Sequence, residues 1–260
     1  MRKTTALIGH TGFVGGNLAR QFSFDECFNS KNIVEIRGRE FDLLVCAGVS
    51  AMKWWANQHP AEDKARIDAL LYNLASVRAK KIVVLSTIDV YPRSSAVDES
   101  FDCHSLPNHA YGTHRLYFEE AMQNQFEEVT VVRISGVFGP GLKKNVIYDL
   151  LHDNCLDIVN PESSFQYYDV SHLWRDLTHL DSTGIRLINF VTEPVRTGDI
   201  IDRFFSGKRV GDKPASTVHY DVRTLHSNEF GGPPHYLARA SDVMADLGNF
   251  VDSIRSGANV

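Results

Sequence analysis

The chain has 260 residues, of which 43% are hydrophobic and 23% are charged, and its formal net charge is -5 at pH 7. This length suits one large domain, or a main domain with a small second region. The acidic balance and the lack of a Lys/Arg block argue against a nucleic-acid surface, and no apolar run has the length of a membrane span. Scattered cysteines, and histidines without metal-ligand spacing, favour a reduced, cytoplasmic protein with no metal site.

The first predicted elements are a strand at Ala6–Ile8 and a helix that continues to Phe22, joined by a turn with three glycines. Gly9 permits a tight turn, Gly12 lets a ligand approach the backbone, and Gly15 lets the helix pack on the strand. The amides at the start of this helix are expected to face a diphosphate. The spacing is G-x-x-G-x-x-G, and a turn whose glycines only permit close packing is the alternative interpretation.

A short strand at Asp25–Asn29 and a brief helix at Lys31–Ile36, capped by Ser30, are expected next. In a dinucleotide-binding fold the end of this strand meets the adenosine ribose, where an acid bonds the 2'-hydroxyl and a basic residue tolerates a 2'-phosphate. The residues there are Asn29, Ser30 and Lys31, none of them acidic, which favours NADP over NAD. A solvated surface charge explains Lys31 equally well.

The continuous apolar run Asp42–Gly48 predicts a strand buried on both faces, whose end at Ala47 and Gly48 passes close to the cofactor. A loop at Met52–Trp55 follows. The periodic apolar positions of Ala61–Lys80 then predict one long helix.

Another buried strand, Lys81–Leu85, ends in the hydroxyl residues Ser86–Thr87. Open α/β sheets bind ligands at this carboxyl edge. A polar loop leads to a helix over 110–126, in which Tyr111 and Arg115 lie one turn apart on the same face.

A β-branched strand at Thr130–Ile134 completes an alternation of strands and helices, which predicts a doubly wound parallel α/β sheet for a dinucleotide-binding domain over 1–141. Residues 142–260 are less periodic and suit a small C-terminal substrate-binding α/β region, with strands that could return to the main sheet. Its predicted elements are helices at 146–151, 171–180, 197–205 and 239–251, a mixed segment at 165–170 and a strand at 185–191.

Four motifs occur in order: G-H-T-G-F-V-G near the N-terminus, L-S-T-I-D-V-Y-P, Y-x-x-x-R, and R-I-S-G-V-F-G-P-G. Together they resemble the extended short-chain dehydrogenase/reductases, the NAD-dependent epimerase/dehydratase group that contains nucleotide-sugar epimerases, dehydratases and reductases. The resemblance covers most of the chain and implies a Rossmann fold. The sequence departs from the family pattern at one position, because Arg115 stands where the family has a lysine.

The resemblance assigns the acid/base role to Tyr111 and an orienting hydroxyl to Thr87, with Ser86 as a neighbour that could substitute. A free phenol has a pKa of about 10, so a nearby cation is expected to stabilise the phenolate. Arg115 keeps the positive charge of the family lysine and could bond the nicotinamide ribose, but it cannot relay a proton.

The remaining site predictions concern the two ligands. A nucleoside diphosphate sugar needs cations, for which Lys143, Lys144 and Arg223 are candidates, although a solvated helix start explains the two lysines nearly as well. Lys53, Trp54 and Trp55 lie at the expected ligand edge, where the aromatic rings either stack on a sugar or base or only pack within the protein. The cofactor-binding residues are predicted to be Gly9, Thr11, Gly12, Phe13, Val14, Gly15, Asn29, Ser30, Lys31, Ala47, Gly48, Ser86, Tyr111, Arg115 and Ser135, and the substrate-binding residues Lys53, Thr87, Lys143, Lys144 and Arg223.

The predicted function is NADP(H)-dependent reduction of a keto-deoxy nucleotide sugar in surface polysaccharide precursor synthesis. A redox-neutral epimerase or dehydratase with bound NAD, and a non-catalytic dinucleotide sensor, remain as alternatives. By analogy with the family, a homodimer through the helices at 61–80 and 111–126 is expected.

Overall fold

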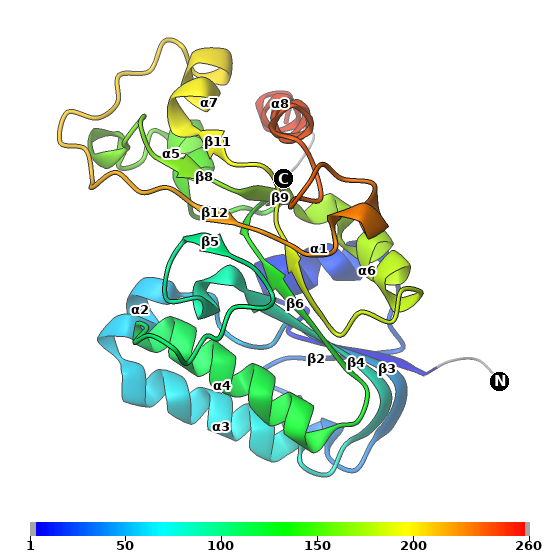
Figure 1. Ribbon diagram of the computed structural model, residues 1–260. Coiled ribbons are helices and arrows are strands. Elements are labelled where there is room, and N and C mark those ends of the chain that lie inside the picture. Colours follow the sequence, from blue (N-terminus) through cyan, green and yellow to red (C-terminus); the bar gives the residue numbers. More distant parts are fainter. Residues whose placement is uncertain (1–3, 258–260) are drawn as a thin grey trace. The chain divides into compact units, whose positions relative to one another are not determined.

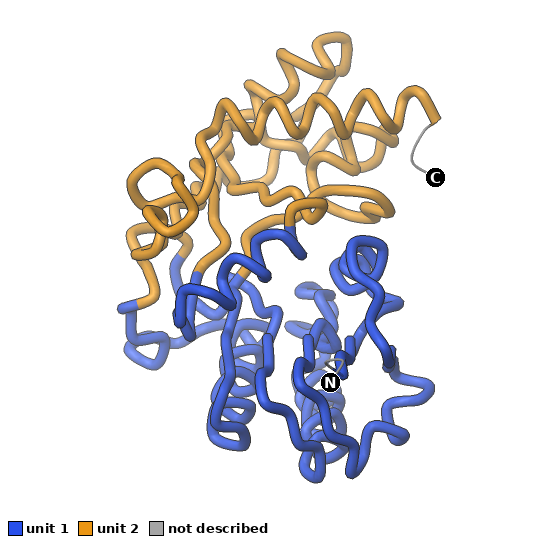
Figure 2. Tube along the Cα trace, turned by 90° about the vertical axis from the view of Figure 1, so that its right-hand side faces the viewer, with its two compact units in different colours: residues 1–93, 100–133, 173–188 blue, residues 94–99, 134–172, 189–260 orange. Residues whose placement is uncertain are grey.

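The computed structural model describes residues 4–257 (Figure 1). Residues 1–3 of the predicted dinucleotide-binding domain and residues 258–260 of the predicted C-terminal region lie outside the described residues. The chain forms two compact units, which Figure 2 colours separately. Unit 1 comprises residues 1–93, 100–133 and 173–188, and unit 2 comprises 94–99, 134–172 and 189–260. The chain therefore passes between the units several times, whereas the sequence predicts one boundary after residue 141.

A six-stranded parallel sheet is the centre of the fold, with the strand order β10-β6-β4-β3-β1-β2. The strands are β1 (Thr5–Ile8), β2 (Glu26–Phe28), β3 (Glu40–Cys46), β4 (Arg78–Thr87), β6 (Val129–Ile134) and β10 (Leu187–Phe190). The doubly wound parallel sheet predicted from the sequence is confirmed. On the β2 side of β1 the sheet has one strand only, because the short segment before β3 forms the 3-10 helix η1 (Ile33–Ile36) instead of a further strand.

The strand order reverses at β1, which pairs in parallel with β2 on one side and with β3 on the other. In register, Ile8 faces Phe28 of β2 and Cys46 of β3, so the three strands end at the same level. Ligands of open α/β sheets bind at such a switch point, beyond the carboxyl ends of the strands. The residues that follow Ile8 and Cys46 are Gly9 and Ala47, both predicted cofactor residues.

Four longer helices cover the sheet of unit 1: α1 (Phe13–Gln21), α3 (Pro60–Leu74), α4 (Ala110–Gln125) and α6 (Leu173–Asp181). Figure 1 shows α3 and α4 on one face and α1 and α6 on the other, as expected for a doubly wound sheet. Fully buried side chains such as Leu44, Leu74 and Ile82 form the core beneath α3 and α4.

Three local predictions are wrong. The helix predicted to reach Lys80 ends at Leu74, because Arg78 already begins β4 and its neighbour Lys80 pairs with Asp42 of β3 at 2.7 Å. The segment predicted as a loop at Met52–Trp55 opens the short helix α2 (Lys53–Gln58), which buries Ala56 completely. The brief helix before β3 is 3-10, and its N-cap position is Asn32, not Ser30.

Unit 2 contains three two-stranded sheets and three α-helices around its own apolar core. The strand pairs are β5 (Ser95–Val97) with β12 (Asp221–Val222), β7 (Gly136–Phe138) with β9 (Tyr167–Asp169), and β8 (Ser164–Phe165) with β11 (Val195–Arg196). The helices are α5 (Val146–His152), α7 (Thr197–Phe204) and α8 (Ala240–Arg255). Among the described residues, the 3-10 turns besides η1 are η2 (Ile88–Val90), η3 (Leu156–Ile158), η4 (Val170–His172) and η5 (Ser227–Phe230). Within residues 4–257, none of the helices combines the length and apolar character that crossing a bilayer requires.

Candidate active site

The glycine turn between β1 and α1 is packed tightly at two of its three glycines. Gly9 has a φ of +88°, and a Cβ there would lie 2.3 Å from the carbonyl oxygen of Ala47. A Cβ on Gly15 would lie 2.3 Å from the carbonyl oxygen of Gly9. Both positions therefore require glycine because the backbones of β1, β3 and α1 approach one another. The packing interpretation of the motif accounts for these two residues.

Gly12 differs, because a side chain there would make one tight contact with the protein and no overlap below 3.0 Å. A Cβ on Gly12 would meet only the Gly9 carbonyl oxygen, at 3.3 Å, and the residue is exposed. Gly12 is the N-cap of α1 and supplies no side-chain hydrogen bond, so the first amides of the helix, beginning with Phe13 and Val14, have no side-chain cap. Exposed Thr11 precedes them in the turn. An uncapped N-terminus behind an open glycine fits the diphosphate of a dinucleotide.

The end of β2 carries no carboxylate. The side-chain oxygen of Asn29 accepts a hydrogen bond from the backbone amide of Lys31 at 2.8 Å, and the Ser30 and Lys31 side chains are exposed. His10, in the glycine turn, lies 3.1 Å through Nδ1 from the Phe28 carbonyl oxygen, so its ring is tied to the backbone. Polar and basic groups thus occupy the position where an adenosine ribose would meet this strand.

The ends of β3 and β4 lie beside this turn. Ala47 donates its amide to the Ile8 carbonyl oxygen at 2.9 Å, and Gly48, which is exposed, leaves no room for a Cβ because Ile8 Cγ2 would be 2.7 Å away. At the end of β4, the Thr87 hydroxyl accepts a hydrogen bond from the Asp89 amide at 3.1 Å. Ser86, by contrast, donates its hydroxyl to buried Glu119.

The structure brings Thr87 and Tyr111 together. Tyr111 is the second residue of α4 and is 6% exposed, and its amide donates to Asn57 Oδ1 of α2 at 2.9 Å. Gly112 lets the start of α4 approach η2, since a Cβ there would lie 2.2 Å from the Asp89 carbonyl oxygen. This approach brings the Tyr111 phenol close enough to the Thr87 side chain for Thr87 to lower the phenol's pKa.

The pKa of Tyr111 is above its ordinary value, whereas the sequence predicted a nearby cation that would stabilise phenolate. Burial raises the pKa, and the Asp89 charge raises it further. The charge of Arg115, the nearby Thr87 side chain and the charge of Lys53 lower it, but they do not outweigh burial. At neutral pH the phenol is therefore protonated and can donate a proton.

Arg115 does not extend toward a ligand through its terminal nitrogens. Its Nη1 and Nη2 both donate to the carboxylate of Asp63 on α3, and Nη2 also donates to the carbonyl oxygen of Ser50. Its guanidinium carbon lies 4.0 Å from the centre of the Tyr111 ring. The buried Nε has no hydrogen-bond partner among the described residues, and one of the two N–H groups of Nη1 is also left without one, so these two donors remain for a ligand.

Ser86 belongs to a buried polar network rather than to an open surface. Its hydroxyl donates to the carboxylate of Glu119, which also accepts hydrogen bonds from Nε and Nη2 of Arg133. The distance between Nη2 of Arg133 and Oε2 of Glu119 is 2.7 Å. Glu119 and Arg133 are 2% and 5% exposed. This network fixes the strand end that carries Thr87 and explains why Ser86 is not the free hydroxyl.

The residues of α2 contribute one charge and two aromatic rings near the site. Lys53 pairs with Asp89 at 2.7 Å, so its charge is shared with a neighbour of Tyr111. Trp55 stacks on His59 with the ring centres 5.1 Å apart and receives the guanidinium of Arg66 on its face, which identifies a packing role. Trp54 is 61% exposed.

The other predicted residues lie in unit 2. Ser135 is buried, and its hydroxyl has no hydrogen-bond partner in the part of the chain that the structure describes. Lys143 and Lys144 are exposed just before α5. Arg223 pairs with Asp221 at 3.0 Å, which neutralises part of its charge, while its Nε has no partner within residues 4–257.

Unit 2 also places three potential metal ligands near one another, although the sequence has no metal-ligand spacing. The ligand atoms of Asp169, His172 and Asp246 lie within 4.8 Å of each other. All three are partly exposed, and Asp169 Oδ1 already accepts the Ser171 amide at 2.7 Å, so the geometry does not distinguish this group from an ordinary surface cluster of polar side chains.

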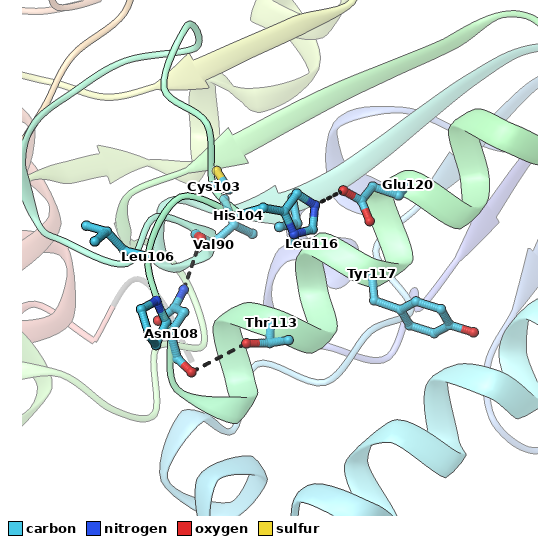
Figure 3. A pocket seen from close by; sticks show the side chains of 10 residues that line it. Val90, Cys103, His104, Leu106, Asn108, Thr113, Leu116, Tyr117 and Glu120 are labelled. Atoms are coloured by element: carbon cyan, nitrogen blue, oxygen red, sulfur yellow. Dashed lines mark hydrogen bonds and ion pairs between the residues drawn. The ribbon is translucent and has the colours of Figure 1, made fainter.

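A cavity of about 210 Å³ lies elsewhere on unit 1, between α4 and the loop before it (Figure 3). Figure 3 shows His104 and Glu120 joined across it, with 2.5 Å between His104 Nε2 and Glu120 Oε1. Cys103, Leu106 and Leu116 contribute apolar surface to it. Neither Thr87 nor Tyr111 lines this cavity, so it is separate from the candidate active site.

A glycine turn at the switch point of a parallel sheet, with a nearby uncapped helix, defines the class of dinucleotide-binding α/β proteins. Within that class, residues 29–183, more than half of the chain, match the model of the NAD dependent epimerase/dehydratase family, and the chain belongs to this family. The matched range begins after the glycine turn. The resemblance predicted from the motifs is confirmed.

Several solved structures of similar fold are named as nucleotide-sugar enzymes. An NAD-dependent NDP-hexosamine 5,6-dehydratase of tunicamycin biosynthesis has a TM-score of 0.77 and 17% identity, with 98% of each chain covered. A UDP-glucose 4-epimerase from Thermotoga maritima, solved with UDP-glucose, has a TM-score of 0.75 and 15% identity over 98% of this chain and 99% of that one. A dTDP-4-dehydrorhamnose reductase from Bacillus anthracis, in complex with NADP, has a TM-score of 0.74 and 15% identity over 97% and 99%. At such identities the likeness establishes the fold, and no curated protein matches the chain in sequence.

Proposed function

We propose that the protein is an NADP(H)-dependent reductase of a keto-deoxy nucleotide sugar, acting in surface polysaccharide precursor synthesis. The observation that carries this proposal is the buried Tyr111 phenol near the Thr87 side chain. Reduction of a ketone needs a proton donor at the carbonyl oxygen, and a buried phenol of raised pKa is suited to that step. A redox-neutral epimerase must first remove a proton from a carbinol, for which a protonated phenol is poorly prepared.

In this reaction Thr87 hydrogen-bonds the sugar carbonyl oxygen and Tyr111 transfers its phenolic proton to the same atom. When bound, a reduced nicotinamide supplies the hydride. The open Gly12 turn would hold the diphosphate, and the unpartnered Nε of Arg115 would donate to a ribose hydroxyl.

The preference for NADP rests on the residues after β2. Asn29→Asp would place a carboxylate where a 2'-phosphate is expected, so we expect it to weaken NADPH binding about tenfold or more, equivalent to about 1.4 kcal/mol, and to spare NADH. Fluorescence titration of both cofactors measures the ratio, with Lys31→Gln as the matched variant that removes a basic charge without adding an acid. An unchanged ratio in Asn29→Asp contradicts the placement of the ribose at β2.

The substrate part of the proposal is supported by the nucleotide sugars named for the structural neighbours, a UDP-glucose 4-epimerase and an enzyme in complex with UDP-glucuronic acid and NAD. Lys53, Lys143, Lys144 and Arg223 are the proposed partners of the sugar diphosphate. A homodimer through α3 and α4, and a reducing cytoplasmic setting in keeping with four free cysteines, belong to the same proposal. Sedimentation as a monomer would contradict the dimer.

Purified protein, NADPH and a panel of 4-keto sugar nucleotides test the function. Loss of cofactor absorbance in a one-to-one ratio with reduced sugar is expected. Turnover of a sugar nucleotide without net cofactor oxidation would replace the reductase with an epimerase or dehydratase.

The raised pKa of Tyr111 gives the reaction a defined pH dependence. The acid form of the phenol is the active one, so the rate of reduction should be constant through neutral pH and fall only as pH rises through a value above 10. Measuring kcat from pH 6 to about 11, with a stability control at each pH, checks this. A fall in kcat near neutral pH that is absent from the stability control would contradict a protonated donor of high pKa.

A dinucleotide sensor without turnover is the second candidate, and the engagement of Arg115 by Asp63 favours it, because that residue is not presented to a cofactor as a free cation. The absence of activity with every keto sugar, together with tight NADPH binding, would support the sensor.

A further inference from the structure

Asp63 is a carboxylate on the buried side of α3, only 2% exposed. It faces Arg115 of α4, 4% exposed, and accepts both of its terminal nitrogens, with Nη2 at 3.0 Å from Oδ1. His114 adds a third contact, with Nδ1 at 2.8 Å from Asp63 Oδ2. Burial alone would raise the pKa of Asp63, but the hydrogen bonds from Arg115 and His114 outweigh it and hold the pKa below its usual value. Asp63 is therefore ionised, and a charged pair is buried between two helices.

The pair holds Arg115 in one place. The carbonyl oxygen of Ser50 takes a further hydrogen bond from Nη2, and the guanidinium lies against the Tyr111 ring at 4.0 Å from its centre. A planar guanidinium suits both the two-point carboxylate contact and the stacking on an aromatic face, which an ammonium group does not reproduce.

We propose that Asp63 is a positioning residue of the Tyr111 site: with the Ser50 carbonyl, it fixes Arg115 as an electrically neutral support beneath the phenol ring. In this arrangement Asp63 offsets most of the positive charge of Arg115 at the ring, and the arginine contributes mainly its shape and its two unused N–H groups. The inference rests on the proposed role of Tyr111 in proton donation, and it specifies the device that keeps the phenol in its donor form.

The other groups that act on Tyr111 are opposed in sign. Lys53 of α2 is paired with Asp89 of η2, and His109, at the N-cap of α4, has a pKa lowered by burial and by the Lys53 charge. The charges of Lys53 and Asp89 act on the Tyr111 phenol in opposite directions, and His109 carries no charge at neutral pH. The net charge next to the Tyr111 ring therefore depends mainly on the Asp63–Arg115 pair.

One consequence is that Arg115→Lys alone should not create a free cation at position 115. A lysine there would still be drawn to Asp63. An unpaired positive charge beside the Tyr111 phenol is expected only when Arg115→Lys is combined with Asp63→Asn.

The test is a charge cycle read by ultraviolet titration of Tyr111 in the substrate-free protein, as the difference from the same variant carrying Tyr111→Phe. Asp63→Asn leaves the arginine charge unopposed and should lower the pKa of Tyr111 by about one unit or more, whereas Arg115→Gln should raise it. The double variant should titrate as the wild type. Asp68→Asn, which removes an exposed carboxylate of the same helix, should change nothing.

Single shifts that are absent, or that have the same sign, would overturn the proposal. Removing one partner of a buried pair can prevent folding, and in that case the double variant decides, because it removes both charges. A Tyr111 pKa in the double variant that differs from the wild type by a unit or more shows that the pair is not neutral and overturns the proposal. The titration needs neither cofactor nor sugar, so failure of the reductase assay leaves its result valid.

Discussion

Replacing Tyr111 with phenylalanine is expected to lower kcat by about 10²- to 10⁴-fold, the usual contribution of a positioned general acid. The substitution removes the phenolic hydroxyl near Thr87, but it keeps the ring against the guanidinium of Arg115. The fold and the affinity for NADPH should therefore be retained. Steady-state kinetics, with cofactor binding measured by fluorescence, checks both halves of the expectation.

Tyr117→Phe is the matched control, since Tyr117 lies on the same helix α4 but is 36% exposed and bonds only exposed Asp68 through its hydroxyl. It should keep wild-type kcat. A Tyr111→Phe protein with unchanged turnover would remove the phenol from the chemistry, and one that loses NADPH binding as well would show that Tyr111 serves the cofactor site and not proton transfer.

The sheet was predictable because each of its strands carries its own signal. The apolar runs that became β1, β3, β4 and β6 need burial on both faces, and only a parallel sheet between helices provides it. The end of α3 and the start of β4 were not predictable, because Arg78 and Lys80 have the sequence pattern of exposed helix positions. In the structure they pair with Glu40 and Asp42 of the neighbouring strand β3. Cross-strand pairing, a non-local interaction, decided between helix and strand.

The sequence predicted which residue types form the site and at which strand ends they lie. It did not predict which charged side chains pair with one another. Tyr111 and Thr87 lie 24 positions apart in the sequence, and the resemblance supplied their relation. The direction of Arg115 depends on Asp63, on a different helix. One signal was present: Asp63 precedes Ile67 and Leu74 at helical spacing, so a carboxylate stands on the apolar stripe of α3. A carboxylate in such a position needs a buried cation, and Arg115 is that cation.

The glycine turn offers a test that separates packing from ligand binding. Gly15→Ala would drive a Cβ to 2.3 Å from the Gly9 carbonyl oxygen and 2.8 Å from its carbon, both backbone atoms that cannot swing aside. We expect a loss of about 3 kcal/mol or more in the free energy of unfolding, since α1 must move away from β1. Against a typical total of about 5–15 kcal/mol, this is enough to lower the yield of folded protein. Urea unfolding measures it, and Gly207→Ala, where a Cβ meets nothing within 4 Å, is the control.

Gly12→Ala should have the opposite profile. Its φ of -79° and ψ of 171° suit any residue, but alanine is a poorer N-cap than glycine and its Cβ would lie 3.3 Å from the Gly9 carbonyl oxygen. We therefore expect a loss of about 1 kcal/mol in the free energy of unfolding, well below that of Gly15→Ala. The same Cβ would occupy the face that a diphosphate must approach to reach the α1 amides, so NADPH affinity should fall at least about tenfold, or about 1.4 kcal/mol. A stable Gly12→Ala protein that binds NADPH as tightly as the wild type would mean that the dinucleotide does not lie over this turn. In that case the open glycine, the uncapped helix and the switch point of the sheet would have to be explained without a cofactor.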